Sequence, residues 1–406
     1  MSGSSHRLVC VTTSASMGGA ETSLVTLVAA LRTLEPAWTV SVIAPSTGPL
    51  LDRCRTLGAS ACVVPYPSAL AALGETAAVT GPRLSASRAV FVAKGVKAAV
   101  TAPPYFRRLR AMFREMESTI VHSNGVKAHI AAAVAAPRAA RLVWHLHDYV
   151  QPRPVTAALL RRLARRADAI VANSDSVRRD AAGALGASRP IRRVYNAVDL
   201  ERFTPAGAAL DLASLADLPR DEGLLRIGLI AAFARWKGHA VFIEALSRMQ
   251  HRDSVRAYII GGPVYETAGS QWSIAELKES AAAHGLRRLV GFTGHIHDVP
   301  AALRSLDIVV HASTEPEPFG MAIAEAMASG RAVVAARAGG ASELFDDGVN
   351  AVGHVPGDAG DLAAKLDELV ADRSRRAALG AAAREAACCR FDPRRMAAEF
   401  REAYFG

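Results

Sequence analysis

The sequence predicts two α/β domains, each built on a doubly wound parallel sheet covered by helices. The chain has 406 residues, well above the usual size of a single domain. Half of the residues are apolar and only 21% are charged, so there is enough apolar material for two packed cores. Short apolar runs alternate along the chain with Ala- and Leu-rich stretches of helical length, which is the pattern of repeated strand–helix–strand units.

The apolar runs are predicted as strands because they lack alternation, as expected of strands buried on both faces of a parallel sheet. In the first half they cover Arg7–Thr13, Thr39–Pro45, Ser60–Tyr66, Thr119–Asn124, Arg141–His147, Ala169–Ser174 and Ile191–Asn196. In the second half they cover Ile227–Phe233, Arg256–Gly262, Arg288–Gly294, Ile308–Ser313 and Arg331–Ala336. The series restarts near residue 225, and the polar stretch Asn196–Asp221 before it is the predicted domain boundary.

Two further regions complete the predicted organisation. Helical composition returns in Ala378–Ala387 and in Asp392–Tyr404. Thr76–Glu117 is interpreted as an insertion rich in Arg, Lys and Pro, in which Pro103–Arg110 interleaves aromatic rings with bases. Such interleaving suits a membrane surface or a bulky anionic acceptor. An ordinary pair of amphipathic helices explains it equally well.

Positive charge is concentrated in the first half of the chain. Residues 1–200 contain 25 Lys and Arg against 11 Asp and Glu, a net charge of +14, whereas residues 201–406 contain 23 against 27, a net charge of −4. This step suggests two domains with different partners, the basic one facing something anionic. An arginine-rich composition on solvated faces is the alternative. A nucleic-acid partner is not expected, because the charge lies on one half and no recognised binding module is present.

The sequence favours a cytoplasmic protein. No uncharged apolar run approaches the roughly 18 residues that a spanning helix needs. The start, Met1–Thr13, lacks the basic segment and full apolar core of a signal peptide and is interpreted as a strand. The five cysteines form no C-x-x-C pair, which favours reduced thiols over disulfides or a structural zinc site.

The first strand-to-helix junction is Thr12–Glu21. Ligands of doubly wound sheets bind beyond the carboxyl ends of the strands, where loops enter helices. Here Gly18 and Gly19 allow backbone N–H groups to approach an anion at the start of the next helix, predicted as Thr22–Leu34. The glycines lack the G-x-G-x-x-G spacing of a dinucleotide site. Glycines in such a turn can also be purely steric.

The junction Ala312–Ala328 has the most specific pattern. A strand ends at Ser313, a loop braced by prolines carries Glu317, and Glu325 follows in the second turn of a predicted helix. A phosphate site flanked by two carboxylates that accept hydroxyls is what binding of a nucleotide-sugar requires. A helix with an acidic first turn is the alternative. The donors at the predicted helix start are the N–H groups of Phe319, Gly320 and Met321.

A third junction, Gly228–His239, places two cations after a strand. Arg235 and Lys237 stand where a pyrophosphate leaving group would need neutralising. Basic residues in a loop are more often simply solvated, so this junction gains its meaning from the neighbouring one.

Histidines end two strands of the first half. His145 and His147 lie on one side of a strand because side chains alternate with a period of two, and His147 is better placed to face a cleft between the domains. His122 and Asn124 end another strand and are expected to line the same cleft. Neither set has metal-ligand spacing, and no D-x-D motif occurs, so no metal site is predicted.

Together these segments resemble the retaining GT-B glycosyltransferases of family 4. The family's motifs occur in order: Gly-Gly-Ala-Glu at 18–21, His-Asp at 147–148, Arg-x-Lys-Gly at 235–238, Glu-x7-Glu at 317–325, and Gly330–Val334 running on to Gly339–Glu343. The resemblance implies the GT-B fold, two Rossmann-like domains facing across a cleft. Residues 1–200 would bind the acceptor and residues 201–390 the donor, and residues 391–406 would form a helix crossing back to the first domain.

The resemblance also implies roles for single residues. His147 would contact the donor sugar, Lys237 would pair with the diphosphate and Glu317 would bind sugar hydroxyls. With Arg235, these are the predicted catalytic residues. The predicted donor-binding residues are Gly18, Gly19, Gly262, Tyr265, Gly294, His295, Ile296, Phe319, Gly320, Met321 and Glu325. The predicted acceptor-binding residues are Glu21, His122, Asn124 and Asp148.

One departure from the family pattern concerns charge. The family carries Gly and then Arg where this chain has Ala231 and Ala232, the second of them five residues before Lys237. Arg235 is expected to supply the missing charge. If it does not, the donor site is weakened, which keeps open a catalytically inactive protein that binds nucleotide-sugars.

The implied activity is glycosyl transfer with retained configuration from a nucleoside-diphosphate sugar to a hydroxyl of a saccharide acceptor. A UDP-sugar is the favoured donor, with GDP-mannose open, and no metal or other cofactor is required. A lipid-linked acceptor at the inner face of the plasma membrane, in polysaccharide or glycolipid synthesis, suits the basic first domain and a peripheral membrane contact. A soluble natural product as acceptor and a nucleotide-sugar epimerase are the alternatives.

Overall fold

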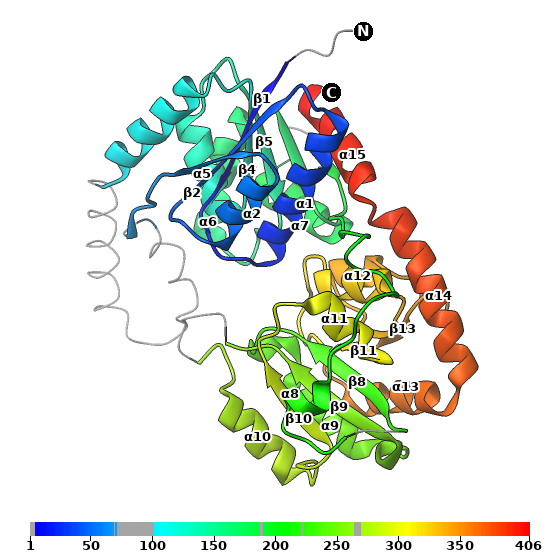
Figure 1. Ribbon diagram of the computed structural model, residues 1–406. Coiled ribbons are helices and arrows are strands. Elements are labelled where there is room, and N and C mark those ends of the chain that lie inside the picture. The colour runs from blue at the N-terminus through cyan, green and yellow to red at the C-terminus, as the bar shows by residue number, and fades with distance from the viewer. Residues whose placement is uncertain (1–4, 69, 71–100, 187–189, 221–222, 264–268) are drawn as a thin grey trace, which may run out of the picture. The chain divides into compact units, whose positions relative to one another are not determined.

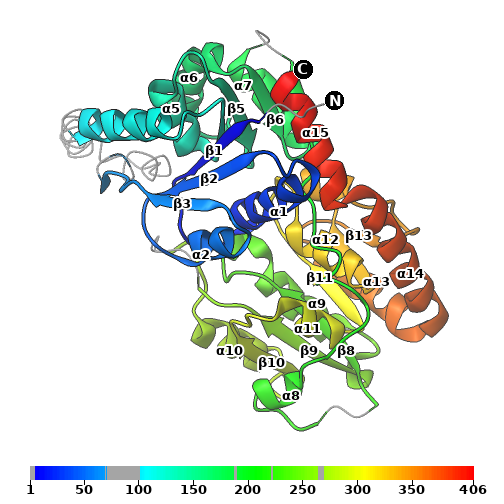
Figure 2. The ribbon, with the colours of Figure 1, turned by 45° about the horizontal axis from the view of Figure 1, so that its top comes forward.

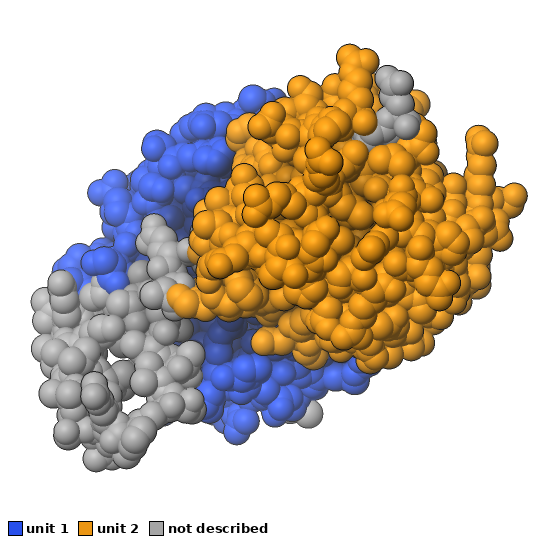
Figure 3. Space-filling view, turned by 90° about the horizontal axis from the view of Figure 1, so that it is seen from below, with its two compact units in different colours: residues 1–195, 393–406 blue, residues 196–392 orange. Residues whose placement is uncertain are grey.

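The computed structural model describes residues 5–68, 70, 101–186, 190–220, 223–263 and 269–406 (Figure 1). The chain divides into two compact units (Figure 3). Unit 1 contains Met1–Tyr195 and Pro393–Gly406, and unit 2 contains Asn196–Asp392. The divisions therefore fall after residues 195 and 392, against sequence-based boundaries after residues 200 and 390. Each unit holds one parallel sheet flanked by helices, which confirms the predicted class of two Rossmann-like domains.

Unit 1 is built on a seven-stranded parallel sheet in the order β3-β2-β1-β4-β5-β6-β7. Its strands are β1 (Arg7–Thr12), β2 (Thr39–Ala44), β3 (Ser60–Val63), β4 (Ile120–Asn124), β5 (Arg141–Leu146), β6 (Ala169–Ala172) and β7 (Ile191–Arg193). The central strands are continuously buried, which explains why their sequences do not alternate. Every predicted run of the first half overlaps one of these strands.

Helices connect the strands of unit 1 because parallel strands need crossover connections. They are α1 (Gly19–Leu34), α2 (Pro49–Thr56), residues 101–115, α5 (Val126–Ala135), α6 (Pro154–Leu163), η1 (Ala164–Arg166), α7 (Asp175–Leu185) and α15 (Pro393–Phe405). Helix α15 comes from the far end of the chain and packs on α1 (Figure 2). Unit 1 is therefore assembled from both ends of the sequence.

The helix at 101–115 accounts for the described part of the predicted insertion. Tyr105, Leu109 and Phe113 recur every four residues and are buried in the core of unit 1. Arg107 and Arg108 lie on exposed positions of the same helix. The interleaved aromatic and basic residues are thus an amphipathic helix packed on the core. Residues 71–100 lie outside the described residues.

Unit 2 is built on a six-stranded parallel sheet in the order β10-β9-β8-β11-β12-β13. Its strands are β8 (Leu225–Ile230), β9 (Val255–Ile260), β10 (Val290–Gly294), β11 (Ile308–His311), β12 (Ala332–Ala336) and β13 (Val352–His354). Strand β13 was not among the predicted runs, because a strand of three residues is too short to stand out as an apolar run.

Helices of unit 2 again follow the strands. They are α8 (Leu212–Leu215), η2 (Arg235–Lys237), α9 (His239–Arg248), η3 (Arg252–Ser254), α10 (Ile274–Ala283), α11 (Val299–Arg304), α12 (Met321–Ala328), η4 (Gly340–Glu343), α13 (Ala359–Ala371) and α14 (Arg373–Arg390). Most of the buried apolar side chains between these helices and the sheet form one cluster.

Both sheets reverse their winding beside their first strand. Strand β1 lies between β2 and β4, and strand β8 lies between β9 and β11. At such a point the loops that leave two neighbouring strands run in opposite directions, which leaves room for a ligand beyond their carboxyl ends. The loops after β1 and β4 in unit 1, and after β8 and β11 in unit 2, are therefore the places where a site is expected.

Candidate functional site

The site in unit 2 is centred on the carboxylate of Glu317. Lys237 Nζ donates to Glu317 Oε1 at 2.6 Å, and the two side chains are only 17% and 12% exposed. The second oxygen, Oε2, lies 2.6 Å from His311 Nε2 and accepts from Ser313 Oγ at 2.8 Å. The two predicted residues, Lys237 and Glu317, are thus brought together by the loops after β8 and β11.

Sequence reasoning missed His311 and Ser313 as partners of Glu317. The available signal was their spacing, because residues two apart at the end of a strand face the same side. His311 is the last residue of β11, and Ser313 follows it two positions later. Both are buried, and Ser313 Oγ also lies 3.1 Å from His311 Nε2.

A glycine allows the loop after β8 to dock on the loop after β11. Gly238 has φ +76°, and a Cβ there would lie 1.8 Å from the carbonyl oxygen of Ala312, so no other residue fits. One residue pair fastens the contact, because Thr314 N donates to Trp236 O at 2.8 Å. Lys237, between Trp236 and Gly238, is therefore held beside Glu317 by backbone geometry.

The backbone of Glu317 is fixed from a third loop. Gly340 N, in the loop after β12, donates to Glu317 O at 2.7 Å, and Gly339 forms a parallel bridge with Glu317. Pro316 and Pro318 flank Glu317 and restrict its backbone dihedrals. The Gly339-Gly340 pair of the sequence pattern thus serves to position the carboxylate.

The charge state of Glu317 follows from its neighbours. Burial raises the pKa of its carboxyl group, but the charges and hydrogen bonds of Lys237 and His311 outweigh burial and hold the pKa well below its usual range. The group is therefore a carboxylate at neutral pH. A carboxylate only accepts hydrogen bonds, which suits hydroxyl-bearing ligands.

Helix α12 begins directly after this loop. Its first residue is Met321, and Gly320 caps it with φ +103°, close to the predicted start at Phe319 or Gly320. The first-turn N–H groups of a helix have no acceptor inside it, and they carry the positive end of the dipole. Glu325 follows in the next turn, where burial raises the pKa of its carboxyl group to about 7, partly opposed by Arg202.

Arg235 is engaged away from Glu317. Its Nη2 donates to Glu276 Oε1 at 3.0 Å and its Nε donates to Gly269 O at 3.1 Å. Its guanidinium also lies 3.8 Å from the ring centroid of Trp272. Arg235 therefore anchors η2 to the segment that leads into α10, and its charge already has a carboxylate partner.

The other predicted donor residues lie on the loops after β9 and β10. Gly262 O accepts from Phe233 N at 3.0 Å, and Gly294 O accepts from Gly261 N at 3.0 Å, so these loops are fastened to each other and to the loop after β8. His295 is exposed and Ile296 is half-buried. Tyr265 lies outside the described residues.

Unit 1 brings a different set together at its own winding reversal. His147 Nε2 lies 2.7 Å from Asn124 Oδ1, and Asn124 Nδ2 donates to Ala20 O at 3.3 Å. Because the amide donates from Nδ2, its Oδ1 accepts, so the proton of His147 is on Nε2. Burial, with a smaller contribution from His122, lowers the pKa of His147 to about 3. The imidazole is therefore neutral.

The start of α1 completes this edge of unit 1. Gly18 precedes the helix and Gly19 is its first residue. Burial raises the pKa of Glu21 in the first turn, against the lowering effect of hydrogen bonds from the backbone of Glu21 and Gly18 and from the Thr12 hydroxyl. Asp148 is exposed, and its Oδ2 lies 3.7 Å from Arg153 Nη1.

His122 is embedded in the core of unit 1. It is fully buried, and its Nδ1 lies 2.8 Å from the hydroxyl of Tyr404 in α15. Its ring packs edge-on against His145, which in turn packs on Phe400 of α15. These contacts account for His122 without an acceptor, and the sequence could not show them because α15 is remote along the chain.

Two kinds of feature are absent from the described residues. No group of three or more His, Cys, Asp or Glu there could hold a metal ion. Within the same residues, no helix has both the length and the apolar character needed to span a bilayer.

Family models match both halves of the chain. The model described as "Glycosyltransferase Family 4" matches residues 17–202, and the model described as "Glycosyl transferases group 1" matches residues 214–386. Together they span nearly all of the two units.

Curated relatives are similar over part of their length. A GDP-mannose-dependent alpha-(1-6)-phosphatidylinositol monomannoside mannosyltransferase of Mycolicibacterium smegmatis is 30% identical over 57% of this chain and 60% of the relative. A D-inositol 3-phosphate glycosyltransferase of Nocardiopsis dassonvillei is 31% identical over 59% of this chain and 56% of the relative. The chain thus aligns with less than two thirds of the length of these relatives.

Solved structures are similar over the whole chain. Anabaena Alr3699/HepE in complex with UDP-glucose has a TM-score of 0.79 and 25% identity, with 98% of each chain covered. Sucrose-phosphate synthase from Thermosynechococcus elongatus has a TM-score of 0.74 at 17% identity, with 98% of each chain covered, which supports the fold.

Proposed function

The chain belongs to glycosyltransferase family 4, and we propose that it transfers a sugar from a nucleoside-diphosphate sugar to a hydroxyl of a saccharide acceptor, with retained configuration. The observation that carries this proposal is the largely buried Lys237–Glu317 pair, which lies at the winding reversal of unit 2, with Glu317 in the loop that leads into helix α12. A cation, a carboxylate and a helix N-terminus are three groups that a phosphorylated sugar needs.

In this proposal Lys237 binds the diphosphate part of the donor and Glu317 binds its sugar part. Lys237 neutralises charge that develops on the departing diphosphate, assisted by the N–H groups at the start of α12, from Phe319 to Met321. Glu317, held ionised by Lys237 and His311, accepts hydrogen bonds from hydroxyls of the transferred sugar. We expect these groups to supply the charge neutralisation for which other transferases use a metal ion.

The nucleoside lies further along the same edge in this proposal. Glu325 binds the ribose hydroxyls, and Gly294 to Ile296 line the base. Gly262 and Tyr265 complete the donor pocket. Because the Glu325 pKa is about 7, its carboxyl group can donate as well as accept near neutral pH.

His147 is the proposed contact of unit 1 with the donor sugar. It is neutral, and its Nε2–H is committed to Asn124, so Nδ1 is the atom that can accept from a sugar hydroxyl. Asn124 is then a positioning residue that sets the tautomer. Gly18 and Gly19 are proposed to approach the diphosphate, and Glu21 and Asp148 the acceptor.

Arg235 is the least supported of the proposed catalytic residues. Its guanidinium can help the diphosphate only if it releases Glu276. The chain also lacks the family's usual arginine, with Ala231 and Ala232 in its place. These two observations favour one second candidate function, a protein that binds nucleotide-sugars without transferring the sugar.

The comparisons bear on which nucleotide-sugar is the donor and which saccharide is the acceptor. The full-length similarity to a UDP-glucose complex supports a UDP-sugar, and the name of the mycobacterial relative supports GDP-mannose. We propose a UDP-sugar as donor and a lipid-linked saccharide of the cell surface as acceptor. Such an acceptor would place the enzyme at the inner face of the membrane.

The first experiment measures binding of UDP, GDP, ADP and TDP to the purified chain in the presence of EDTA. Thermal shift and saturation-transfer NMR are the two readouts. Selective stabilisation by one diphosphate is expected and names the base. The matching nucleotide-sugars are then incubated with the enzyme, and NMR of released or transferred sugar gives the anomeric configuration. Binding without any sugar release or transfer would favour the non-catalytic function, and no binding at all would overturn both.

A further inference from the structure

Four arginines line a pocket of unit 1 that the proposed transfer does not use. The pocket has a volume of about 580 Å³. Arg138 lies in the segment that joins α5 to β5, and Arg166 ends η1 shortly before β6. Both therefore precede the amino ends of strands, whereas the groups assigned to the donor and acceptor follow carboxyl ends. The pocket therefore lies at the amino ends of the strands, whereas His147 lies at their carboxyl ends.

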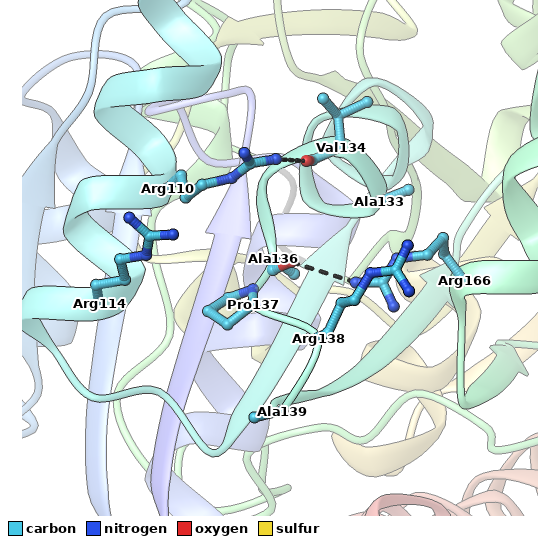
Figure 4. Close-up of a pocket in the computed structure, with 9 residues that line it drawn as sticks. All are labelled: Arg110, Arg114, Ala133, Val134, Ala136, Pro137, Arg138, Ala139 and Arg166. Carbon is cyan, nitrogen blue, oxygen red and sulfur yellow. Dashed lines mark hydrogen bonds between the residues drawn. The ribbon is translucent and has the colours of Figure 1, made fainter.

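The other two arginines come from the helix at 101–115. Arg110 and Arg114 are four residues apart and share one face of that helix (Figure 4). The neighbouring face is fixed in the core by Leu109 and Phe113, which are fully buried. Figure 4 shows Arg110 and Arg114 reaching from the helix, with Arg138 and Arg166 beyond the loop at Pro137.

None of the four guanidinium groups has a carboxylate partner among the described residues. Arg110 Nη2 donates to Val134 O at 2.6 Å, and Arg166 Nη2 donates to Ala136 O at 3.2 Å, so these two are oriented by carbonyls. For Arg114 and Arg138, no side-chain hydrogen bond or ion pair is found within that part of the chain. Glu117, which follows the helix, is already paired, because its Oε2 lies 2.9 Å from Arg7 Nη2.

Like charges that share one small pocket raise its free energy unless an anion joins them. Arg55 and Arg178 of unit 1 do pair with carboxylates, whereas these four arginines do not among the described residues. A guanidinium presents a planar set of donors that fits phosphate oxygens two at a time. The walls are otherwise apolar, from Val134, which is 37% exposed, and Pro137.

We propose that this pocket binds a phosphate group carried on a larger molecule. The four guanidinium groups have no carboxylate partner among the described residues and can surround the oxygens of a phosphate, and the volume and apolar walls leave room for the group that carries it. The carrier is either a soluble phosphorylated metabolite or the headgroup of an anionic phospholipid. The inference does not rest on the proposed transfer, because its residues lie in unit 1 and away from the winding reversal.

The test uses the full chain with Lys237→Ala, so that phosphate binding at the donor site is removed from the readout. The pocket variant adds Arg114→Gln and Arg138→Gln, which remove charge without removing a hydrogen bond of the fold. The matched control adds Arg162→Gln and Arg165→Gln instead, two exposed arginines outside the pocket. Glycerol 3-phosphate is titrated by calorimetry, and phosphatidylcholine vesicles with and without phosphatidylglycerol are tested by sedimentation.

The expected result is binding of one or both probes that weakens about tenfold or more in the pocket variant and stays within a factor of about two in the control. Binding of glycerol 3-phosphate identifies a soluble carrier, and binding only to vesicles with phosphatidylglycerol identifies a lipid headgroup. Equal losses in the two variants, or no binding of either probe by the parent protein, would overturn the proposal.

Folding is controlled by a second measurement. Relief of repulsion should leave the pocket variant at least as heat-stable as its parent without phosphate. Phosphate should raise Tm only in the parent and the control. If the Gln variant does not fold, Arg114→Lys with Arg138→Lys is used instead. This variant keeps the charge but loses the forked pair of guanidinium donors, so binding should still weaken severalfold. Undiminished binding in that Lys variant would contradict recognition of phosphate by the arginine fork.

Discussion

The two units wind their sheets alike around the first strand, yet they place opposite chemistry at the reversal. In unit 2, beside β8 and β11, Lys237 and Glu317 form a nearly buried ion pair. In unit 1, beside β1 and β4, Asn124 and His147 form a neutral network of an amide and an imidazole. The winding thus decides where a site lies, and the residues at the strand ends decide whether it handles charge or orientation.

Acid should destabilise unit 1 more than unit 2, and this is the largest difference in stability that we expect between them. His122 and His147 of unit 1 have pKa values of about 3 because they are buried, so the stability that their neutral forms give is complete above pH 6.5 and is lost as the pH falls. At pH 5 the loss is about 2 kcal/mol for each, and the raised pKa of Glu21 offsets only part of the sum.

Unit 2 should resist the same change. Burial lowers the pKa of His239 to about 4, which costs stability in acid, but it raises the pKa of Glu325 to about 7. A raised carboxyl pKa gives stability at low pH that is lost as the pH rises to 7, so the two effects nearly cancel at pH 5. Hydrogen exchange of the full chain at pH 7 and pH 5 measures this; faster exchange in unit 2 than in β4 and β5 would contradict the contrast.

Removal of the Glu317 carboxylate should have the largest effect on activity. Glu317→Ala leaves Lys237 without its partner and removes the proposed sugar contact, so kcat/KM should fall about a thousandfold while the circular dichroism spectrum is retained. The free energy of unfolding should fall by about 2 kcal/mol. The control is Glu315→Ala, an exposed carboxylate on the same loop. Full activity of Glu317→Ala would remove the central proposal.

The two cations after β8 should differ clearly. Lys237→Met should lower kcat/KM by about a hundredfold or more, because the diphosphate loses its nearest charge. Arg235→Met should lower it by about tenfold at most, because that guanidinium is already paired with Glu276. Steady-state kinetics of the two variants decide the matter. Equal losses would show that Arg235 leaves Glu276 during the reaction and replaces the family's arginine.

The neutral network of unit 1 should be the most tolerant. Asn124→Ala frees the His147 ring, so kcat should fall about tenfold while KM for the donor stays unchanged. The nitrogen chemical shifts of the His147 ring should then show loss of the Nε2–H tautomer. Asn350→Ala, which removes another buried amide in unit 2, is the control. An unchanged tautomer with a lowered kcat would give Asn124 a purely structural role.

Much of the fold could be predicted from the sequence because buried parallel strands are continuous apolar runs. Each predicted run overlaps a strand, and β13 was missed because three residues carry too little pattern. The meeting of Lys237 and Glu317 was also foreseeable, since each follows a strand beside the reversal. The partners of Arg235 were not, because Glu276 is 41 residues away and sits on a different element.

The identity of the buried histidine contacts was equally hidden. Nothing in the sequence around His122 indicates that Tyr404, 282 residues further on, approaches its ring. Such contacts depend on where α15 packs, and a pattern of apolar residues predicts that a helix is buried but not against what. The sequence therefore places His122 on a buried strand, but it shows neither the burial of its ring nor its partners.

Helix α15 also affects the order in which the two units can be completed during translation. Residues 196–392 of unit 2 have all been made before Phe400 and Tyr404, the two aromatic rings that cover His122 and His145 in unit 1. The half of the protein that the ribosome starts first is thus the half that finishes last. Until α15 is available, unit 1 lacks the two rings that cover His122 and His145, whereas every residue of unit 2 has already been translated.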